Sequence, residues 1–208
     1  EAAVHFARTI ERMPKHTEAR GALGRTLAIL GRGSEAESYL RQVMSPDAAA
    51  ELQAALGNVL AETGRTNEAT PYFEKARQKD PKLADQYLQQ GKMYLAQGQG
   101  QPALAAFAIA ARLEPESAAA QESWGLLLAA QGKFPAAVPH LEKSLQLQPT
   151  AQGYYNLALA MALQGEGTKA VTHLERALAL DPNLSAALND LAWTLATDTT
   201  AAMRNGTK

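Results

Sequence analysis

Small residues recur along the chain every 33 or 34 residues in three separate columns. The first column is Gly24, Gly57, Gly91, Gly125, Ala158 and Ala192. The second column follows seven residues later and is Gly31, Gly64, Gly98, Gly132 and Gly165. The third column is Ala2, Ala36, Ala69, Ala103, Ala137 and Ala170. Three columns in phase do not arise by chance, so the sequence predicts a structural unit repeated along the whole chain.

Each unit is predicted to contain two helices. Bulky apolar residues such as Leu56 and Leu60 lie four positions apart around the first column, a spacing that places them on one helical face. The second-column glycine supplies the positive φ that ends this helix, and a proline closes most units. Polar residues beyond the glycine are expected to cap the second helix, namely Ser34, Asn67 and Thr168.

Composition and charge exclude several classes of protein. Apolar residues make up 46% of the 208 residues, enough to bury a core, and the net charge is -1. A neutral chain does not attract nucleic acid electrostatically, so we expect no nucleic-acid partner. No apolar run has the length of a membrane span, so we expect no direct membrane insertion. The chain has no cysteine, which excludes disulfides and thiolate metal sites.

A 34-residue helix-turn-helix with these glycine, alanine, aromatic and proline columns resembles the tetratricopeptide repeat family over residues 1 to about 197. The resemblance implies an all-α solenoid of antiparallel helix pairs that forms a right-handed superhelix. We expect a single array over 1–197: a half repeat at 1–16, full repeats beginning at 17, 50, 84, 118 and 151, and the first helix of a sixth at 185–197. Residues 198–208 are expected to be an extended tail or linker. The start and end within repeats favour a fragment of a longer bacterial protein of this family.

Residues for catalysis or cofactor binding are not found, so we predict neither an enzyme nor a cofactor. His140 and His173 occupy the same place in consecutive second helices, but no third ligand has matching spacing, and we predict no metal site. The segment Gly98-Gln99-Gly100 lacks the preceding strand and the lysine of a nucleotide loop, and it is interpreted as a turn.

Binding of a protein or peptide is the remaining function. The family resemblance implies that the first helix of each pair lines a concave groove that recognises an extended segment or a helix of another protein. The inward side chains are expected to include Glu18, Glu51, Asp85, Ser123, Gln152, Asp190 and Trp193. The peptide-binding groove is assigned to Arg25, Asn58, Gln89, Lys92, Glu122, Leu126, Tyr155, Asn156, Leu159 and Asn189. Its amino-terminal half is charged, whereas its carboxy-terminal half is apolar and aromatic, a character suited to burial in an interface.

Two alternatives to a scaffold with a binding groove stay open. The array could be the substrate-recognition arm of a larger glycosyltransferase-like enzyme; an asparagine ladder of the kind found in O-linked N-acetylglucosamine transferase is present only in degenerate form, as Gln89, Ser123, Asn156 and Asp190. It could also be a self-assembling module, because the unpaired last helix presents Leu188, Leu191 and Leu195 to another molecule.

Overall fold

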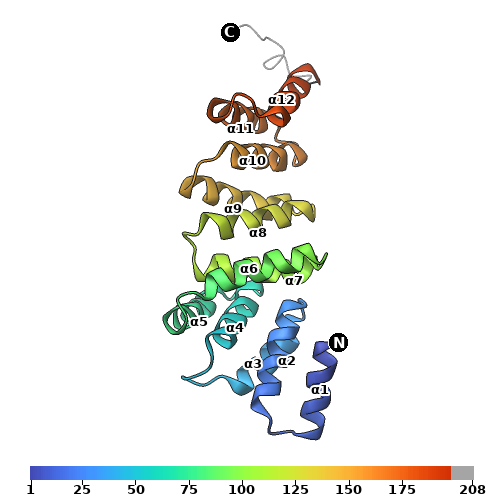
Figure 1. The fold of residues 1–208 in the computed structure, drawn as a ribbon, viewed down its shortest axis with the longest axis vertical. Coiled ribbons are helices and arrows are strands. Elements are labelled where there is room, and N and C mark those ends of the chain that lie inside the picture. The colour runs from blue at the N-terminus through green and yellow to red at the C-terminus, as the bar shows by residue number, and fades with distance from the viewer. Residues whose placement is uncertain (198–208) are drawn as a thin grey trace. The chain divides into compact units, whose positions relative to one another are not determined.

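The computed structural model describes residues 1–197, and over this range the chain is all-α, with twelve helices that follow one another in packed antiparallel pairs (Figure 1). The expected tail at 198–208 lies outside the described residues. The helices are α1 Ala2–Arg12, α2 Thr17–Ile29, α3 Gly33–Val43, α4 Ala50–Glu62, α5 Thr66–Lys79, α6 Leu83–Ala96, α7 Gly100–Leu113, α8 Ala118–Ala130, α9 Phe134–Leu147, α10 Ala151–Leu163, α11 Gly167–Leu180 and α12 Ser185–Thr197.

The turns between paired helices follow the glycine column. All five second-column glycines have φ between 71° and 83°, a left-handed conformation that residues with a Cβ adopt at a steric cost. In the turn after α2, the amide of Arg32 bonds back to the carbonyl of Leu27 at 2.9 Å, as in a Schellman-type helix end. The prediction that these glycines end the first helices is therefore confirmed.

The predicted caps of the second helices were wrong. Helices α3, α5 and α11 begin at Gly33, Thr66 and Gly167, one residue before Ser34, Asn67 and Thr168, so these polar residues lie inside the helices and cap none of them. Side-chain caps occur instead on first helices. His16, Ser117 and Thr150 each accept a hydrogen bond from the backbone amide three residues later.

The helices form two compact units, residues 1–115 and the part of the chain that begins at Glu116. In the second unit each helix packs on its neighbours along the chain: α8 on α9, α9 on α10, α10 on α11 and α11 on α12. Its core contains the small column residues Ala158 and Ala170 together with bulky residues such as Leu141, Leu157 and Leu174. Small residues on one helix face bulky ones on the next, which lets the helix axes approach closely.

The first unit departs from this neighbour-to-neighbour pattern. Helix α7 packs on its partner α6 and also on α2, α4 and α5. Its residues 105–111 are all buried, so the helix is enclosed around its circumference. Alanine provides most of this surface, and the uniformly apolar sequence of α7 is typical of a helix with no solvent-facing side. The third helix pair therefore covers the faces of α2 and α4 that were expected to line an open groove.

Candidate binding surfaces

The three first helices of the second unit carry a large apolar residue at the same sequence position. The residue after the small first-column residue is Leu126 in α8, Leu159 in α10 and Trp193 in α12. Their exposed fractions are 38%, 43% and 72%. Large apolar side chains at the same position of three successive first helices are unusual on a solvated face, because a surface helix is normally polar on that side.

Polar groups flank these three side chains. The hydroxyl of Tyr155 donates to Oδ2 of Asp190 at 3.0 Å and joins α10 to α12. Burial of Tyr155 raises its pKa, and the hydrogen bond to Asp190 adds to the shift, so the phenol stays a donor at neutral pH. The Gln152 side-chain amide donates to Oδ1 of Asn156 at 3.0 Å along α10.

We call this set the first-helix surface. It consists of Glu122, Leu126, Gln152, Tyr155, Asn156, Leu159, Asn189, Asp190 and Trp193. Among the residues assigned to the groove from sequence, Asn189 is exposed, whereas Glu122, Tyr155 and Asn156 are partly buried. The helix pairing thus brings the assigned residues of α8, α10 and α12 onto one set of packed helices.

The assigned residue Asn58 does not line an open groove. It is 0% exposed, and its side-chain oxygen accepts a hydrogen bond from the guanidinium of Arg112 in α7. Its amide donates to Glu62 at 3.0 Å. Burial lowers the pKa of Arg112, which is partly buried in α7. The physical reason for the correction is that α7 covers the inner face of α4.

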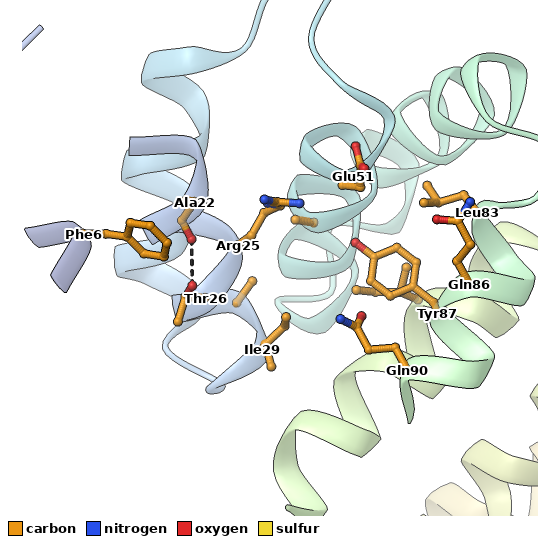
Figure 2. A pocket seen from close by; sticks show the side chains of 13 residues that line it. Phe6, Ala22, Arg25, Thr26, Ile29, Glu51, Leu83, Gln86, Tyr87 and Gln90 are labelled. Atoms are coloured by element: carbon orange, nitrogen blue, oxygen red, sulfur yellow. Dashed lines mark hydrogen bonds between the residues drawn. The ribbon is translucent and has the colours of Figure 1, made fainter. Parts of the chain in front are cut away.

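The other assigned residues of the first unit fall into two groups. Gln89 and Lys92 are exposed on α6. Arg25 is partly buried and lines a cavity of about 370 Å³ between α1, α2, α4, α6 and α7. The polar residues of this lining are Arg25, Thr26, Glu51, Gln86, Tyr87 and Gln90. Figure 2 shows the guanidinium of Arg25 and the hydroxyl of Tyr87 pointing toward one another across it.

Sequence reasoning missed Tyr87, Gln86 and Gln90. Tyr87 falls on the apolar stripe of α6 and is 7% exposed, so its position was that of a core residue. A buried tyrosine hydroxyl normally has a hydrogen-bonding partner, so a tyrosine on an apolar helix face was the one sign in the sequence that polar groups lie nearby. Without knowledge that α7 folds onto α2 and α4, no spacing in the sequence places these residues beside Arg25.

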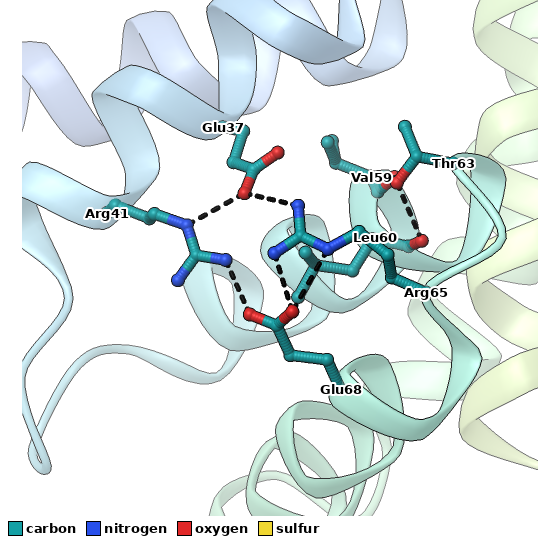
Figure 3. Close-up of polar contacts among 7 residues, drawn as sticks. All are labelled: Glu37, Arg41, Val59, Leu60, Thr63, Arg65 and Glu68. Carbon is teal, nitrogen blue, oxygen red and sulfur yellow. Dashed lines mark hydrogen bonds and ion pairs between the residues drawn. The ribbon is translucent and has the colours of Figure 1, made fainter.

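A network of four charged side chains joins the second helices α3 and α5 (Figure 3). Arg41 binds Glu37 at 2.8 Å and Glu68 at 2.5 Å, and Arg65 binds the same two carboxylates at 2.7 Å and 2.5 Å. These bonds lower the pKa of Glu37 and of Glu68. Each of the four groups is paired with two others of opposite charge, so we interpret the network as a link between α3 and α5.

The two histidines at equivalent positions make different contacts. His140 stacks on Trp124 with ring centroids 3.7 Å apart, and its Nδ1 lies 2.9 Å from the side-chain oxygen of Gln121. His173 lies 6.0 Å from the ring of Tyr154, and burial together with nearby Arg176 lowers its pKa. Across residues 1–197, no cluster of three or more histidines and carboxylates is placed to hold a metal ion. Over the same range, no helix combines the length and apolar character needed to cross a bilayer.

Two family models, both described as Tetratricopeptide repeat, match the chain. One matches residues 88–150 and 122–185 and the other matches 50–83, so together they cover more than half of the sequence. No curated protein sequence shows significant similarity to the chain.

Solved structures show similarity of fold. The crystal structure of YrrB, described as a TPR protein with an unusual peptide-binding site, has 22% identity and a TM-score of 0.50, and the match covers 89% of this chain and 96% of that one. The first TPR domain of Spaghetti (RPAP3), bound to the HSP90 peptide SRMEEVD, has 21% identity and a TM-score of 0.53, over 55% of this chain and 92% of that one. A thermophilic TPR protein from Thermus thermophilus, TTC0263, has 22% identity and a TM-score of 0.49, over 86% and 99%.

Proposed function

We propose, from the premise that this chain belongs to the tetratricopeptide repeat family, that it is a noncatalytic interaction module whose first-helix surface binds a peptide segment of a partner protein. The family consists of scaffold proteins that are typically noncatalytic. The observation that carries the proposal is the exposure of Leu126, Leu159 and Trp193 at one position of three successive first helices. Burial of such side chains is the main source of affinity in protein interfaces.

The chemistry of the surface defines the ligand. Exposed apolar side chains lie along the line from α8 to α12, and the amides of Gln152, Asn156 and Asn189 lie beside them. Apolar side chains of a peptide would bury on the former, and its backbone would hydrogen-bond to the latter.

Peptide binding by structural relatives supports this proposal. YrrB is described as having a peptide-binding site, and the Spaghetti domain is bound to an HSP90 peptide in its solved structure. At 21–22% identity these structures support the fold, and the residues of the site in this chain are argued from its own surface.

The test is selection of peptides from a random seven-residue display library on the full chain, followed by measurement of Kd. Leu159→Asp should weaken the selected peptides about 10- to 100-fold, because burial of one leucine contributes about 1.5–3 kcal/mol and about 1.4 kcal/mol corresponds to a factor of ten. The matched control is Leu180→Asp on the second helix α11, where a leucine of similar exposure should be replaced without loss. Equal losses in both variants, or no selected peptide, would refute the first-helix surface as the binding site.

Self-association through α12 is a second candidate. Leu188 and Leu195 of α12 are 47% and 37% exposed and add apolar area at the end of the described helices. A second copy that docked there would make the sedimenting mass rise with concentration, and Leu188→Asp would suppress the rise. A mass that stays monomeric over a hundredfold range of concentration would exclude this candidate. A role as the substrate-recognition arm of a larger enzyme would use the same first-helix surface, with the substrate protein as the ligand.

A further inference from the structure

The cavity in the first unit contains charges of both signs that are not paired with each other. Arg25 and Glu51 both line it, yet within residues 1–197 no ion pair joins either of them to another side chain. In the same unit, Glu37, Arg41, Arg65 and Glu68 are paired with one another (Figure 3).

Arg25 has an unused donor at the cavity. Its Nε is buried from solvent and makes no hydrogen bond in the structure. A buried donor left unsatisfied destabilises the protein, so a ligand atom that accepts this hydrogen bond recovers a cost that the protein already bears. Carboxylate oxygens are the preferred acceptors of guanidinium groups.

Tyr87 provides a second donor beside it. Burial raises the pKa of the Tyr87 hydroxyl, and the opposing charges of Arg25 and Glu51 act on it from the same cavity. The hydroxyl therefore stays protonated and can donate to an anionic group near Arg25 (Figure 2). Gln86 and Gln90 add side-chain amides, which donate and accept, to the lining.

We propose that this cavity binds a zwitterionic ligand, either a free amino acid or a peptide segment with neighbouring acidic and basic side chains. The ligand's carboxylate binds Arg25 and Tyr87, and its ammonium group binds Glu51. The volume of about 370 Å³ lies in the range of small-molecule sites. The site belongs to the first unit and uses none of the residues of the first-helix surface, so the two proposals are independent.

The test uses the full chain and defined probes. Free amino acids are examined one at a time by thermal shift, and those that bind are measured by calorimetry. Succinate supplies carboxylates without an amine, and butylamine supplies an amine without a carboxylate. The blocked peptide acetyl-Ala-Glu-Lys-Ala-amide carries both charges on side chains only. We expect binding by free amino acids, by the blocked peptide or by both, and at least tenfold weaker binding of succinate and butylamine.

Variants test the assignment to this cavity. Arg25→Gln and Glu51→Gln should each weaken the zwitterionic ligand about 10- to 100-fold, and Tyr87→Phe should do so about 10-fold while it preserves the ring in the core. The matched controls Arg77→Gln and Glu74→Gln change exposed charges of α5, and Leu159→Asp changes the first-helix surface; all three should retain binding. Helix content measured by circular dichroism identifies any variant that fails to fold.

The source of the ligand follows from the two kinds of probe. Binding of a free amino acid alone identifies a small molecule, whereas binding of the blocked peptide alone identifies a protein segment. Binding of neither kind of probe overturns the proposal. So does affinity that is unchanged in Tyr87→Phe and in a folded Arg25→Gln variant.

Discussion

Replacement of Gly91 by alanine should destabilise the first unit, although alanine is the better helix former. A Cβ built on Gly91 would lie 2.5 Å from Cδ1 and 3.0 Å from Cζ of Phe107, whereas carbon atoms in contact are about 3.5–4.0 Å apart. The ring is 2% exposed and enclosed by α7 and its neighbours, so it has little room to move. Overpacking of this kind costs about 1–3 kcal/mol.

Gly57→Ala is the matched variant. Gly57 occupies the same position one repeat earlier, and its added Cβ would lie 3.2–3.3 Å from the ring of Phe73, a much smaller overlap. Both variants gain about 1 kcal/mol of helix propensity. The difference between their free energies of unfolding therefore reports the overlap alone, and we expect Gly91→Ala to be the less stable by about 1–3 kcal/mol.

The rescue variant is Gly91→Ala combined with Phe107→Leu. The chain already contains this pair in a later repeat, because Ala158 packs with Leu174 in the core of the second unit. The double variant should be more stable than the sum of its two single changes predicts, which a double-mutant cycle measures. Urea denaturation followed by far-UV circular dichroism provides the free energies.

Tryptophan fluorescence supplies an internal control. Trp124 and Trp193 are the two tryptophans of the chain, and both belong to the second unit. Their transition should move less than the helical signal when Gly91 is replaced. A Gly91→Ala protein as stable as Gly57→Ala, or additive behaviour with Phe107→Leu, would refute the close contact between α6 and α7.

Three further predictions concern charged and polar groups. The pKa of His173 is lowered in the folded protein, so as the pH falls the histidine is protonated first in the unfolded chain. The free energy of unfolding should therefore fall as the pH drops below about 6.5. Between pH 7.5 and 5.5, the urea midpoint of the wild type should fall more than that of His173→Gln. Asn58→Leu should cost about 1–3 kcal/mol in urea denaturation, because the buried Arg112 guanidinium loses an acceptor, and Arg112→Met should cost less, because the charge leaves with the bond. Glu37→Gln should lower the Tm at low ionic strength and have little effect in 1 M NaCl, since salt screens the network of α3 and α5; an equal loss at both salt concentrations would contradict an electrostatic role.

Local features of this fold could be predicted from the sequence because they depend on neighbouring residues. The turn glycines and the small-to-bulky packing columns have the same physical cause in every repeat, so their spacing gives the helix pairs directly. The predicted caps lie two positions after the observed N-cap residues in all three helices, because several residues near a helix start can occupy that position.

Long-range packing could not be predicted in this way. The pair formed by α6 and α7 has the same columns of small residues as the other helix pairs. Nothing in these columns shows that α7 packs on α2 and α4. The burial of Asn58 and the grouping of Arg25 with Tyr87 both follow from that packing. In the second unit, where helices contact their neighbours in order, Leu126, Leu159 and Asn189 are exposed on successive first helices, and their role in binding stays a prediction.

The contacts of α7 also affect how the first unit can unfold. In a linear repeat protein the free energy is a sum of terms for single repeats and for adjacent interfaces, so the ends fray and repeats can be removed one by one. Here α7 contacts α2, the pair formed by α4 and α5, and its own partner α6. Loss of α7 would therefore remove all of these interfaces together. Residues 1–115 should therefore melt in one cooperative step, and a version cut at Lys79 would be an incomplete domain instead of a shorter array.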